Sequence, residues 1–253
     1  MGEKLTAIVP AFNEEANIRE CLESVRWADE VVVVDSFSTD STADICRALG
    51  VKLVQHEYAN SAAQKNWILP QTGHRWVLIV DADERVTPAL RDEIAGLLAG
   101  GPACDGYWIR RRNRFMGKEV RFCGWQRDKV LRFFDRDKGR YEEKHVHAEV
   151  QLNGKVGFLR SPLAHDSYRD FSSYLRKLDK YTDWGAQDLI KKGRHASVVD
   201  LVVRPPARFV RMYLLQLGVL DGVRGLIVCT LGATSVFLKY AKLWRSSQKS
   251  GAR

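Results

Sequence analysis

Two aspartates separated by one residue follow a short hydrophobic run. Trp76–Val80 is entirely apolar, and Asp81-Ala82-Asp83 comes directly after it. A buried strand over Trp76–Val80 would carry both carboxylates to its exposed end. Carboxylate oxygens so placed suit Mg²⁺ or Mn²⁺, and such an ion can bridge the oxygens of a diphosphate. The pattern therefore predicts a divalent-metal site for a phosphorylated ligand.

Two other interpretations use the same aspartates. The pair could be a polar turn before a helix that Pro88 opens. Phosphatases of the haloacid dehalogenase type also place Asp-x-Asp after a hydrophobic strand, with the first aspartate as nucleophile. They carry it on the first strand, with Thr or Val two residues past the second aspartate. Here it follows the fourth strand-like run and Arg85 stands in that place, so the metal site is favoured.

A further carboxylate stands at the end of a second hydrophobic run. Asp35 follows Val31–Val34 directly. At a strand end its carboxylate could accept hydrogen bonds from a uracil N–H or a ribose hydroxyl. Ser38, Thr39 and Asp40 would cap the next helix. Turn and capping chemistry alone is the alternative interpretation of the whole string.

The sequence pattern around these residues predicts an open α/β sheet. Short β-rich runs alternate with segments of helical pattern over the first hundred residues, at Leu5–Val9, Val31–Val34, Val51–Val54 and Trp76–Val80. Continuous apolar runs separated in this way are typical of buried parallel strands with crossover helices. Such sheets bind ligands at the carboxyl ends of their strands, where the aspartates fall.

The middle of the chain has a different pattern. Three aromatic or alternating runs, Tyr107–Phe115, Lys129–Phe134 and Val146–Leu152, are separated by glycines and predict antiparallel strands. Alternation in the first run places Arg111 on one face and its other arginines on the opposite face. One of these faces could bind a diphosphate or an anionic acceptor, or the arginines could belong to a solvated strand.

The last hundred residues are helical and basic. Phe171–Leu189 has apolar positions three and four apart, and further helices follow from Pro205 to Leu243. Residues 155–253 contain 18 Lys and Arg against 7 Asp and Glu, whereas residues 1–154 contain 22 against 24. The last two helices are apolar on more than one face. They fit either an interfacial helix on an anionic membrane or a pair of core helices.

Composition excludes several classes of protein. The chain has 253 residues, 45% of them hydrophobic, so intrinsic disorder is excluded. Five widely spaced cysteines form neither a zinc ribbon nor a disulfide scaffold, which favours a reducing compartment. Leu5–Phe12 is too short and too interrupted for an export signal. The longest apolar stretch, Leu226–Leu238, has 13 residues, so no membrane-spanning helix is expected.

An ordered series of motifs resembles the family 2 glycosyltransferases, which are inverting enzymes with a GT-A fold. The motifs are Ile8-Val-Pro10-Ala-Phe-Asn13-Glu14, Val34-Asp35-Ser-Phe-Ser-Thr-Asp40-Ser-Thr42, Gln64-Lys65-Asn66 and Asp81-Ala82-Asp83-Glu84. Later motifs resemble the bacterial lipopolysaccharide core glucosyltransferase subgroup: Gly124-Trp-Gln-Arg-Asp128, Val130-Leu-Arg132, Val146-His147, Leu163-Ala-His165 and the tail from Arg208 to Tyr240. The resemblance covers nearly the whole chain.

The resemblance implies an α/β fold of the GT-A (Rossmann-like) type. We expect a glycosyltransferase domain over residues 1–165, with a nucleotide-binding half at 1–100 and an antiparallel acceptor half at 101–165. Residues 166–253 would form a basic helical region able to associate with a membrane.

The resemblance also implies roles for particular residues. The nucleotide-sugar site would comprise Pro10, Asn13, Glu14, Asp35, Lys65, Asn66, Asp81 and Ala82. Asp81 and Asp83 would hold the divalent metal, Mg²⁺ or Mn²⁺, and the diphosphate.

Several residues are candidates for the catalytic base. Inverting transfer needs a group that deprotonates the acceptor hydroxyl. Asp128 is the first candidate, followed by Glu149 and His147, because these lie in the segment that family members use for the acceptor. In the subgroup an acidic residue follows the histidine directly, whereas here Ala148 follows it. A surface ion pair or a packed histidine is the alternative interpretation of each, and His165 is expected to be structural or to contact the acceptor.

The function implied is metal-dependent, inverting transfer of glucose from UDP-glucose to a lipid-linked glycan such as lipopolysaccharide core. The expected partners are a UDP-sugar donor, a lipid-linked saccharide acceptor and an anionic membrane surface. The protein is expected in the cytoplasm, bound peripherally to the inner face of the cytoplasmic membrane. The alternative is a non-catalytic membrane-surface or nucleic-acid binding module. No RNA-binding signature is present, so no nucleic acid is expected as a partner.

Overall fold

The computed structural model describes residues 2–142, 149–168 and 171–250. The chain forms two compact units. The first contains residues 1–112 and 128–165, and the second contains residues 113–127 and 166–253. The segment 113–127 thus lies with the helical C-terminal region, although in sequence it interrupts the first unit.

A parallel sheet forms the N-terminal part of the first unit. Its strands, in spatial order, are β3 (Lys52–Gln55), β2 (Glu30–Asp35), β1 (Leu5–Ala11) and β4 (Trp76–Ile79). In the register Ala11 pairs with Asp35, and Ile8 pairs with both Val32 and Ile79. The carboxyl ends of these strands therefore lie side by side, and the predicted open α/β sheet is confirmed.

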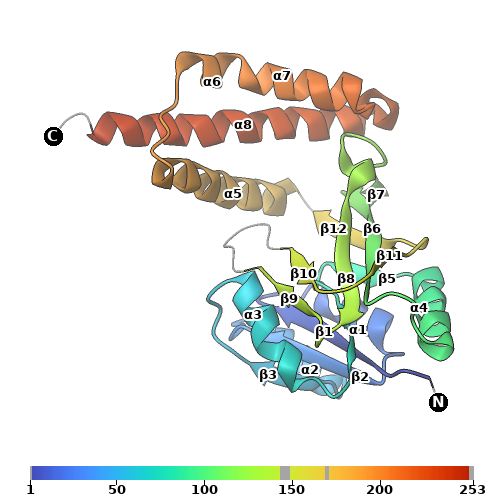
Figure 1. Ribbon diagram of the computed structural model, residues 1–253. Helices are drawn as coiled ribbons and strands as arrows, with labels where there is room; N and C mark the ends of the chain where they lie inside the picture. Colours follow the sequence, from blue (N-terminus) through green and yellow to red (C-terminus); the bar gives the residue numbers. More distant parts are fainter. Residues whose placement is uncertain (1, 143–148, 169–170, 251–253) are drawn as a thin grey trace. The chain divides into compact units, whose positions relative to one another are not determined.

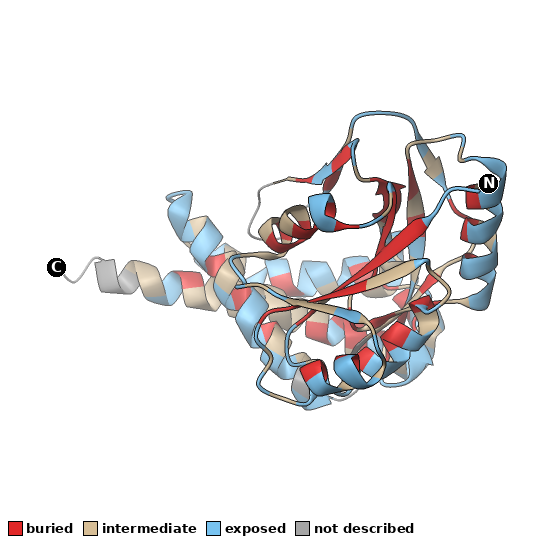
Figure 2. Cartoon of the chain, turned by 90° about the horizontal axis from the view of Figure 1, so that it is seen from below, coloured by how far each residue is buried: buried red, intermediate tan, exposed pale blue. Residues whose placement is uncertain are grey.

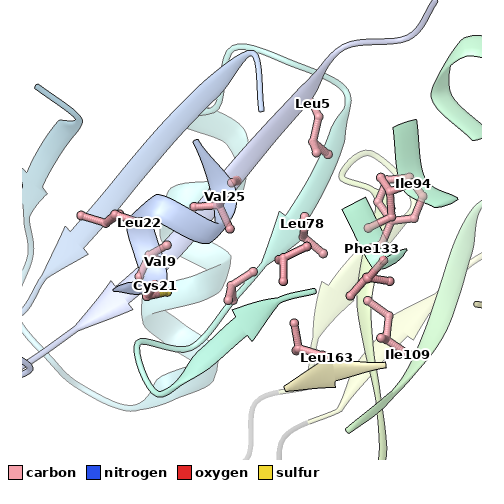
Figure 3. Close-up of a cluster of buried hydrophobic side chains, with 14 of the residues drawn as sticks. Leu5, Val9, Cys21, Leu22, Val25, Leu78, Ile94, Ile109, Phe133 and Leu163 are labelled. Carbon is pink, nitrogen blue, oxygen red and sulfur yellow. The ribbon is translucent and has the colours of Figure 1, made fainter. Parts of the chain in front are cut away.

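Helices cover this sheet because its strands are apolar on both faces. They are α1 (Ile18–Val25), α2 (Thr42–Ala48), α3 (Ser61–Ile68) with the short η1 (Leu69–Gln71), and α4 (Pro88–Gly100). In Figure 3, Leu22 and Val25 of α1 lie against Val9 and Leu78 of the sheet. Figure 2 shows the same division, with buried positions gathered on the strands and the helices alternating buried and exposed.

Antiparallel strands extend the sheet beyond β4. The order continues with β8 (Lys129–Asp135), β6 (Gly106–Phe115), β12 (Leu163–Tyr168) and β5 (Glu84–Val86). Two further strands pair with β6, β7 (Lys118–Glu119) in antiparallel and β11 (Val156–Phe158) in parallel. The strands predicted at Tyr107–Phe115 and Lys129–Phe134 are confirmed. The third prediction is confirmed in part, because β10 (Val150–Leu152) pairs with β9 (Gly139–Tyr141) in a separate sheet. Residues 146–148 of that prediction lie outside the described residues.

The second unit consists largely of helices. These are α5 (Phe171–Lys191), α6 (Val198–Val202), α7 (Arg204–Val210), the π-helical turn η3 (Arg211–Leu215), the 3₁₀ turn η4 (Gly218–Asp221) and α8 (Gly222–Ser250), with η2 (Trp125–Arg127) in the inserted segment. In Figure 1, α8 lies between α5 on one side and α6 and α7 on the other. The break predicted at Gly218 or Gly222 is confirmed.

By length and composition alone, the helical stretch Gly218–Ser247 could cross a membrane. This differs from the expectation that no stretch is long enough. That expectation counted uninterrupted apolar residues, whereas a helix with scattered small and polar residues reaches a comparable mean hydropathy over a greater length.

Hydrogen bonds and one close backbone approach join the parts of the second unit. The Asp221 carboxylate accepts hydrogen bonds from the backbone N–H groups of Arg121 (3.1 Å) and Phe122 (2.8 Å). A Cβ added at Gly225 would lie 1.8 Å from the carbonyl oxygen of Gly218. Only glycine therefore fits where α8 leaves the turn.

Candidate active site at the carboxyl edge of the sheet

Asp81 lies just beyond the end of β4 and contacts two cationic side chains. The Lys65 Nζ atom is 3.0 Å from Asp81 Oδ1, and the Arg132 guanidinium bonds Asp81 Oδ2. Burial opposes ionisation of Asp81, but the charges of Arg132 and Lys65 outweigh it and hold the pKa of that carboxyl well below its usual range. Asp81 is therefore an ionised carboxylate whose charge is already balanced within the protein.

The two cations come from different elements and are both buried. Lys65 lies on α3 and Arg132 on β8, and their residues are 4% and 7% exposed. The Arg132 side chain also donates to the Tyr141 hydroxyl (3.1 Å), while its Nε is buried without a hydrogen-bond partner among the described residues. Burial lowers the pKa of Arg132, but the charges and hydrogen bonds of Asp81, Tyr141 and Glu84 together raise it well above its usual value. Arg132 is therefore a charged guanidinium held in place by its neighbours.

A second ion-pair group adjoins the first. The fully buried Glu84 accepts a hydrogen bond from the Asp81 backbone N–H (2.9 Å), and its Oε1 is 3.4 Å from Arg111 Nη1. Burial raises the pKa of Glu84. Arg111 also binds Asp128 through two hydrogen bonds, of 3.0 and 2.8 Å. The predicted alternation along β6 is observed, because Arg110 is exposed and Arg111 is half-buried.

Asp83 lies beside His165, which the sequence analysis expected to be structural or to contact the acceptor and did not place with the metal-binding aspartates. The His165 Nε2 is 3.6 Å from Asp83 Oδ1, and both side chains are largely buried, at 14% and 17% exposure. Burial opposes protonation of His165, but the pairing with Asp83 raises its pKa overall. Among the described residues, no three His, Cys, Asp or Glu side chains converge closely enough to hold a metal ion. Asp83 and His165 are therefore at most a partial set of metal ligands.

A cavity of about 360 Å³ opens beside this network in the first unit. It is lined by Ser61, Lys65, Asp81, Trp108, Arg111, Asp128, Lys129, Val130, Leu131, Arg132, Tyr141, Glu149 and Val150. Two of the three candidates for the catalytic base, Asp128 and Glu149, thus share one cavity with Asp81. The third, His147, lies outside the described residues.

The predicted nucleotide-binding residues at the ends of β1 and β2 form a separate hydrogen-bonded group. Asn13 has a left-handed backbone (φ 54°), and its side-chain Oδ1 accepts a hydrogen bond from the Thr39 N–H (2.8 Å). The Glu14 N–H donates to the Thr42 hydroxyl (2.8 Å). Asp35 is fully buried and accepts bonds from Ser38 and Gln55. These contacts are the turn chemistry that the sequence also allowed. The predicted capping is met only in part, because the N-cap of α2 is Ser41, whose side chain makes no capping hydrogen bond, while Asp40 accepts from the Thr42 N–H (3.0 Å).

The remaining predicted residues have mainly structural contacts. Pro10 pairs with Val34 in the β1–β2 register. The Asn66 side chain donates to the Tyr141 carbonyl (2.9 Å) and accepts from the Tyr141 N–H (2.8 Å), so it fastens α3 to β9. Ala82 is packed in the hydrophobic core. None of the three lines the described cavity.

The sequence contains a sign that Arg132 belongs to the site, although no role was predicted for it. Arg132 stands inside Val130–Phe134, a run that is otherwise apolar, and a charge in a buried strand requires a buried partner. The motif Leu163-Ala-His165 named His165, but no local pattern placed it beside Asp83, because the pairing of β12 with β5 brings the two together.

Comparison with known proteins identifies the family. A model of the family described as Glycosyl transferase family 2 matches residues 6–180, which is more than half of the chain and includes every residue of the network described above. The chain belongs to glycosyltransferase family 2. It is therefore a glycosyltransferase, its architecture is of the GT-A type, and the resemblance seen in its motifs is confirmed.

Relatives of this family 2 glycosyltransferase span nearly its whole length. It is 30% identical over 95% of its length to the lipopolysaccharide core biosynthesis glycosyltransferase LpsC of Rhizobium meliloti, of which it covers 92%. It is 26% identical over 99% of its length to an uncharacterized glycosyltransferase, RC0292, of Rickettsia conorii, of which it covers 93%. The likeness to the lipopolysaccharide core subgroup is thus confirmed.

One solved structure is similar to part of the chain. The glucosyl-3-phosphoglycerate synthase of Mycobacterium tuberculosis, in complex with Mn²⁺, UDP and glucosyl-3-phosphoglycerate, is 24% identical, with a TM-score of 0.38. The match covers 45% of either chain, so the family 2 glycosyltransferase spans less than half the length of that structure.

Proposed function

We propose that this family 2 glycosyltransferase moves glucose from UDP-glucose, with inversion, to a lipid-linked saccharide such as lipopolysaccharide core. The observation that carries the proposal is the cation-rich cavity at the carboxyl edge of β4, where Lys65, Arg111 and Arg132 surround Asp81 and Asp128. The name of the LpsC relative supports the acceptor class. A peripheral place on the cytoplasmic face of the membrane belongs to the same proposal.

Cationic side chains in the cavity would receive the donor diphosphate. Lys65, Arg111, Lys129 and Arg132 all line it. Negative charge grows on UDP as the sugar leaves, and fixed cations in a largely buried site stabilise that charge without reorganising.

The nucleoside would lie over the ends of β1 and β2. Asn13 and Asp35 hold the two loops there in fixed positions. Phe12 and Phe37 in these loops are 56% and 51% exposed, and their rings offer stacking surfaces for a base. Asp35 would contact the base or ribose only after one of its internal hydrogen bonds is exchanged.

A divalent metal fits Asp83 and His165 better than it fits Asp81. The Asp83 carboxylate and the His165 imidazole supply a hard oxygen and a nitrogen donor, whereas Asp81 is already neutralised by Lys65 and Arg132. Mg²⁺ and Mn²⁺ sites commonly use one or two protein ligands and complete their coordination with phosphate oxygens and water. When bound, the ion would polarise the diphosphate and favour departure of UDP.

Asp128 would accept the proton of the acceptor hydroxyl, with Glu149 as the second candidate. The two hydrogen bonds from Arg111 fix the Asp128 carboxylate in the cavity. The same Arg111 guanidinium lies 3.4 Å from the buried Glu84 carboxyl.

The test is release of UDP from a panel of nucleotide sugars, with Mn²⁺ present and with or without a membrane extract as acceptor source. We expect UDP-glucose to be consumed, faster with the extract. Consumption of a different nucleotide sugar would refute the donor, and extract-independent hydrolysis of a simple phosphomonoester would indicate a phosphatase.

A further inference from the structure

The turn between α7 and α8 exposes large aliphatic side chains. Leu215, Leu220 and Val223 are 77%, 63% and 74% exposed, and Leu214, Leu217, Val219 and Leu226 are also exposed. All lie within residues 214–226, where the chain passes through η3 and η4 into α8. Single exposed leucines are ordinary on protein surfaces, whereas a contiguous group of this kind marks an interaction surface.

A second group of exposed aliphatic side chains lies on α6, which precedes the turn in the helical unit. Val198, Val199 and Val202 of α6, and Val203 directly after it, are between 53% and 73% exposed. In Figure 1, α6 and α7 follow one another along one side of α8 and lead into the turn. The exposed aliphatic side chains therefore occur at residues 198–203, at Val210 and at residues 214–226.

Arginines accompany this surface, and its acids are already engaged. Arg204, Arg208 and Arg211 are exposed between the two aliphatic groups. Asp200 accepts hydrogen bonds from Ser197 and pairs with Arg204, and the Asp221 carboxylate accepts from the two backbone N–H groups named above. The combination of exposed aliphatic residues and guanidinium groups matches an anionic lipid surface.

The basic residues near the end of α8 are used differently. The Lys242 Nζ atom is 2.7 Å from Asp179 and 2.8 Å from Asp183, both on α5. Lys239 is half-buried, and burial lowers its pKa. Lys239 and Lys242 of the basic C-terminal region are thus engaged within the helical unit, whereas the arginines of α7 and the turn are exposed and make this stretch the candidate contact surface.

We infer that residues 198–226 form the surface with which the protein lies in the headgroup region of an anionic bilayer, without crossing it. This inference rests on the proposed function, because a lipid-linked acceptor must be reached at such a surface. The alternative, that α8 spans the bilayer, would break its ion pairs with α5 and expose their charges to lipid.

The test is flotation of the full-length protein with vesicles of phosphatidylglycerol and phosphatidylethanolamine, compared with vesicles of phosphatidylcholine alone. Neither donor nor acceptor is present. We expect the wild type to bind the anionic vesicles preferentially. The double variant Leu215→Glu/Leu220→Glu should bind them at least about tenfold more weakly, and Arg208→Glu/Arg211→Glu should lose the anionic preference.

The matched control is Leu175→Glu/Ile190→Glu on α5, whose side chains are 44% and 45% exposed. It should bind vesicles as the wild type does. Should the turn variant fail to fold by circular dichroism, Leu215→Trp provides a second measurement. Its fluorescence should be quenched by lipids brominated in their acyl chains, more than that of Leu175→Trp.

Three results would overturn the inference: no binding by the wild type, equal loss in the turn and control variants, or retention in the membrane after alkaline carbonate extraction. Failure of the proposed function is distinguishable, because UDP release is measured separately with detergent-dispersed acceptor. If the protein binds vesicles but releases no UDP, the proposed sugar transfer is refuted and the inferred membrane-binding surface is not.

Discussion

Replacing Arg132 with methionine tests whether the buried ion pair with Asp81 is structural, functional or both. Arg132→Met keeps much of the side-chain volume and removes the charge. The Arg132 side chain is 8% exposed and that of Asp81 is 33% exposed. Removing one partner of a buried pair costs about 3–5 kcal/mol, and partial exposure of Asp81 together with its second partner Lys65 favours the lower end, about 3 kcal/mol.

The expected loss is measurable by thermal unfolding. A loss of about 3 kcal/mol lowers the melting temperature by roughly 6–12 °C in a chain of this size. Arg110→Met, an exposed arginine on β6, is the control and should change the melting temperature by no more than about 2 °C. Stabilisation of Arg132→Met by UDP with Mn²⁺ should also be weaker than that of the wild type.

A double-mutant cycle measures the interaction energy between Asp81 and Arg132 apart from the destabilisation that each substitution causes by itself. Asp81→Asn alone leaves Lys65 and Arg132 buried without their counter-charge, so it should destabilise strongly. Adding Arg132→Met removes one of those uncompensated charges, and the double variant should be more stable than the sum of the single effects by about 1–3 kcal/mol. Additive losses, or an unchanged melting temperature in Arg132→Met, would refute the reasoning.

Three further predictions follow from the site and the fold. Asp83→Asn and His165→Gln should each abolish the part of UDP stabilisation that depends on Mn²⁺, measured by thermal shift; retention of that part in both variants would contradict the metal assignment. Asp128→Asn should lower the rate of sugar transfer by about 10²-fold or more while UDP still binds, and wild-type transfer would remove it as the base. Gly225→Ala should destabilise the protein by at least about 1–3 kcal/mol in urea unfolding, because its Cβ would meet the Gly218 carbonyl. Gly96→Ala, on α4 with open space around it, should instead be neutral or stabilising by up to about 1 kcal/mol.

The ion pairs around Asp81 could not be predicted from the sequence alone. Its members come from α3, β5, β6, β8 and the turn after β4, and burial drives their charges to pair with one another. Sequence reasoning named Lys65 and Asp81 through motifs. It named Arg111 only as one face of a strand, and it did not assign a role to Arg132, because charge pairing depends on which strands become neighbours.

The sequence by itself predicted the buried parallel strands, the helical segments and the family. Continuous β-branched runs such as Val31–Val34 favour buried strands, and the alternation of Arg110 and Arg111 follows from the two-residue period of a strand. The tertiary structure decided which charges meet. The antiparallel pairing of β12 with β5 brings His165 to Asp83, and folding of the α7–α8 turn exposes Leu215 and Leu220. Contacts between residues distant in the chain depend on strand order and packing, which local periodicity does not encode.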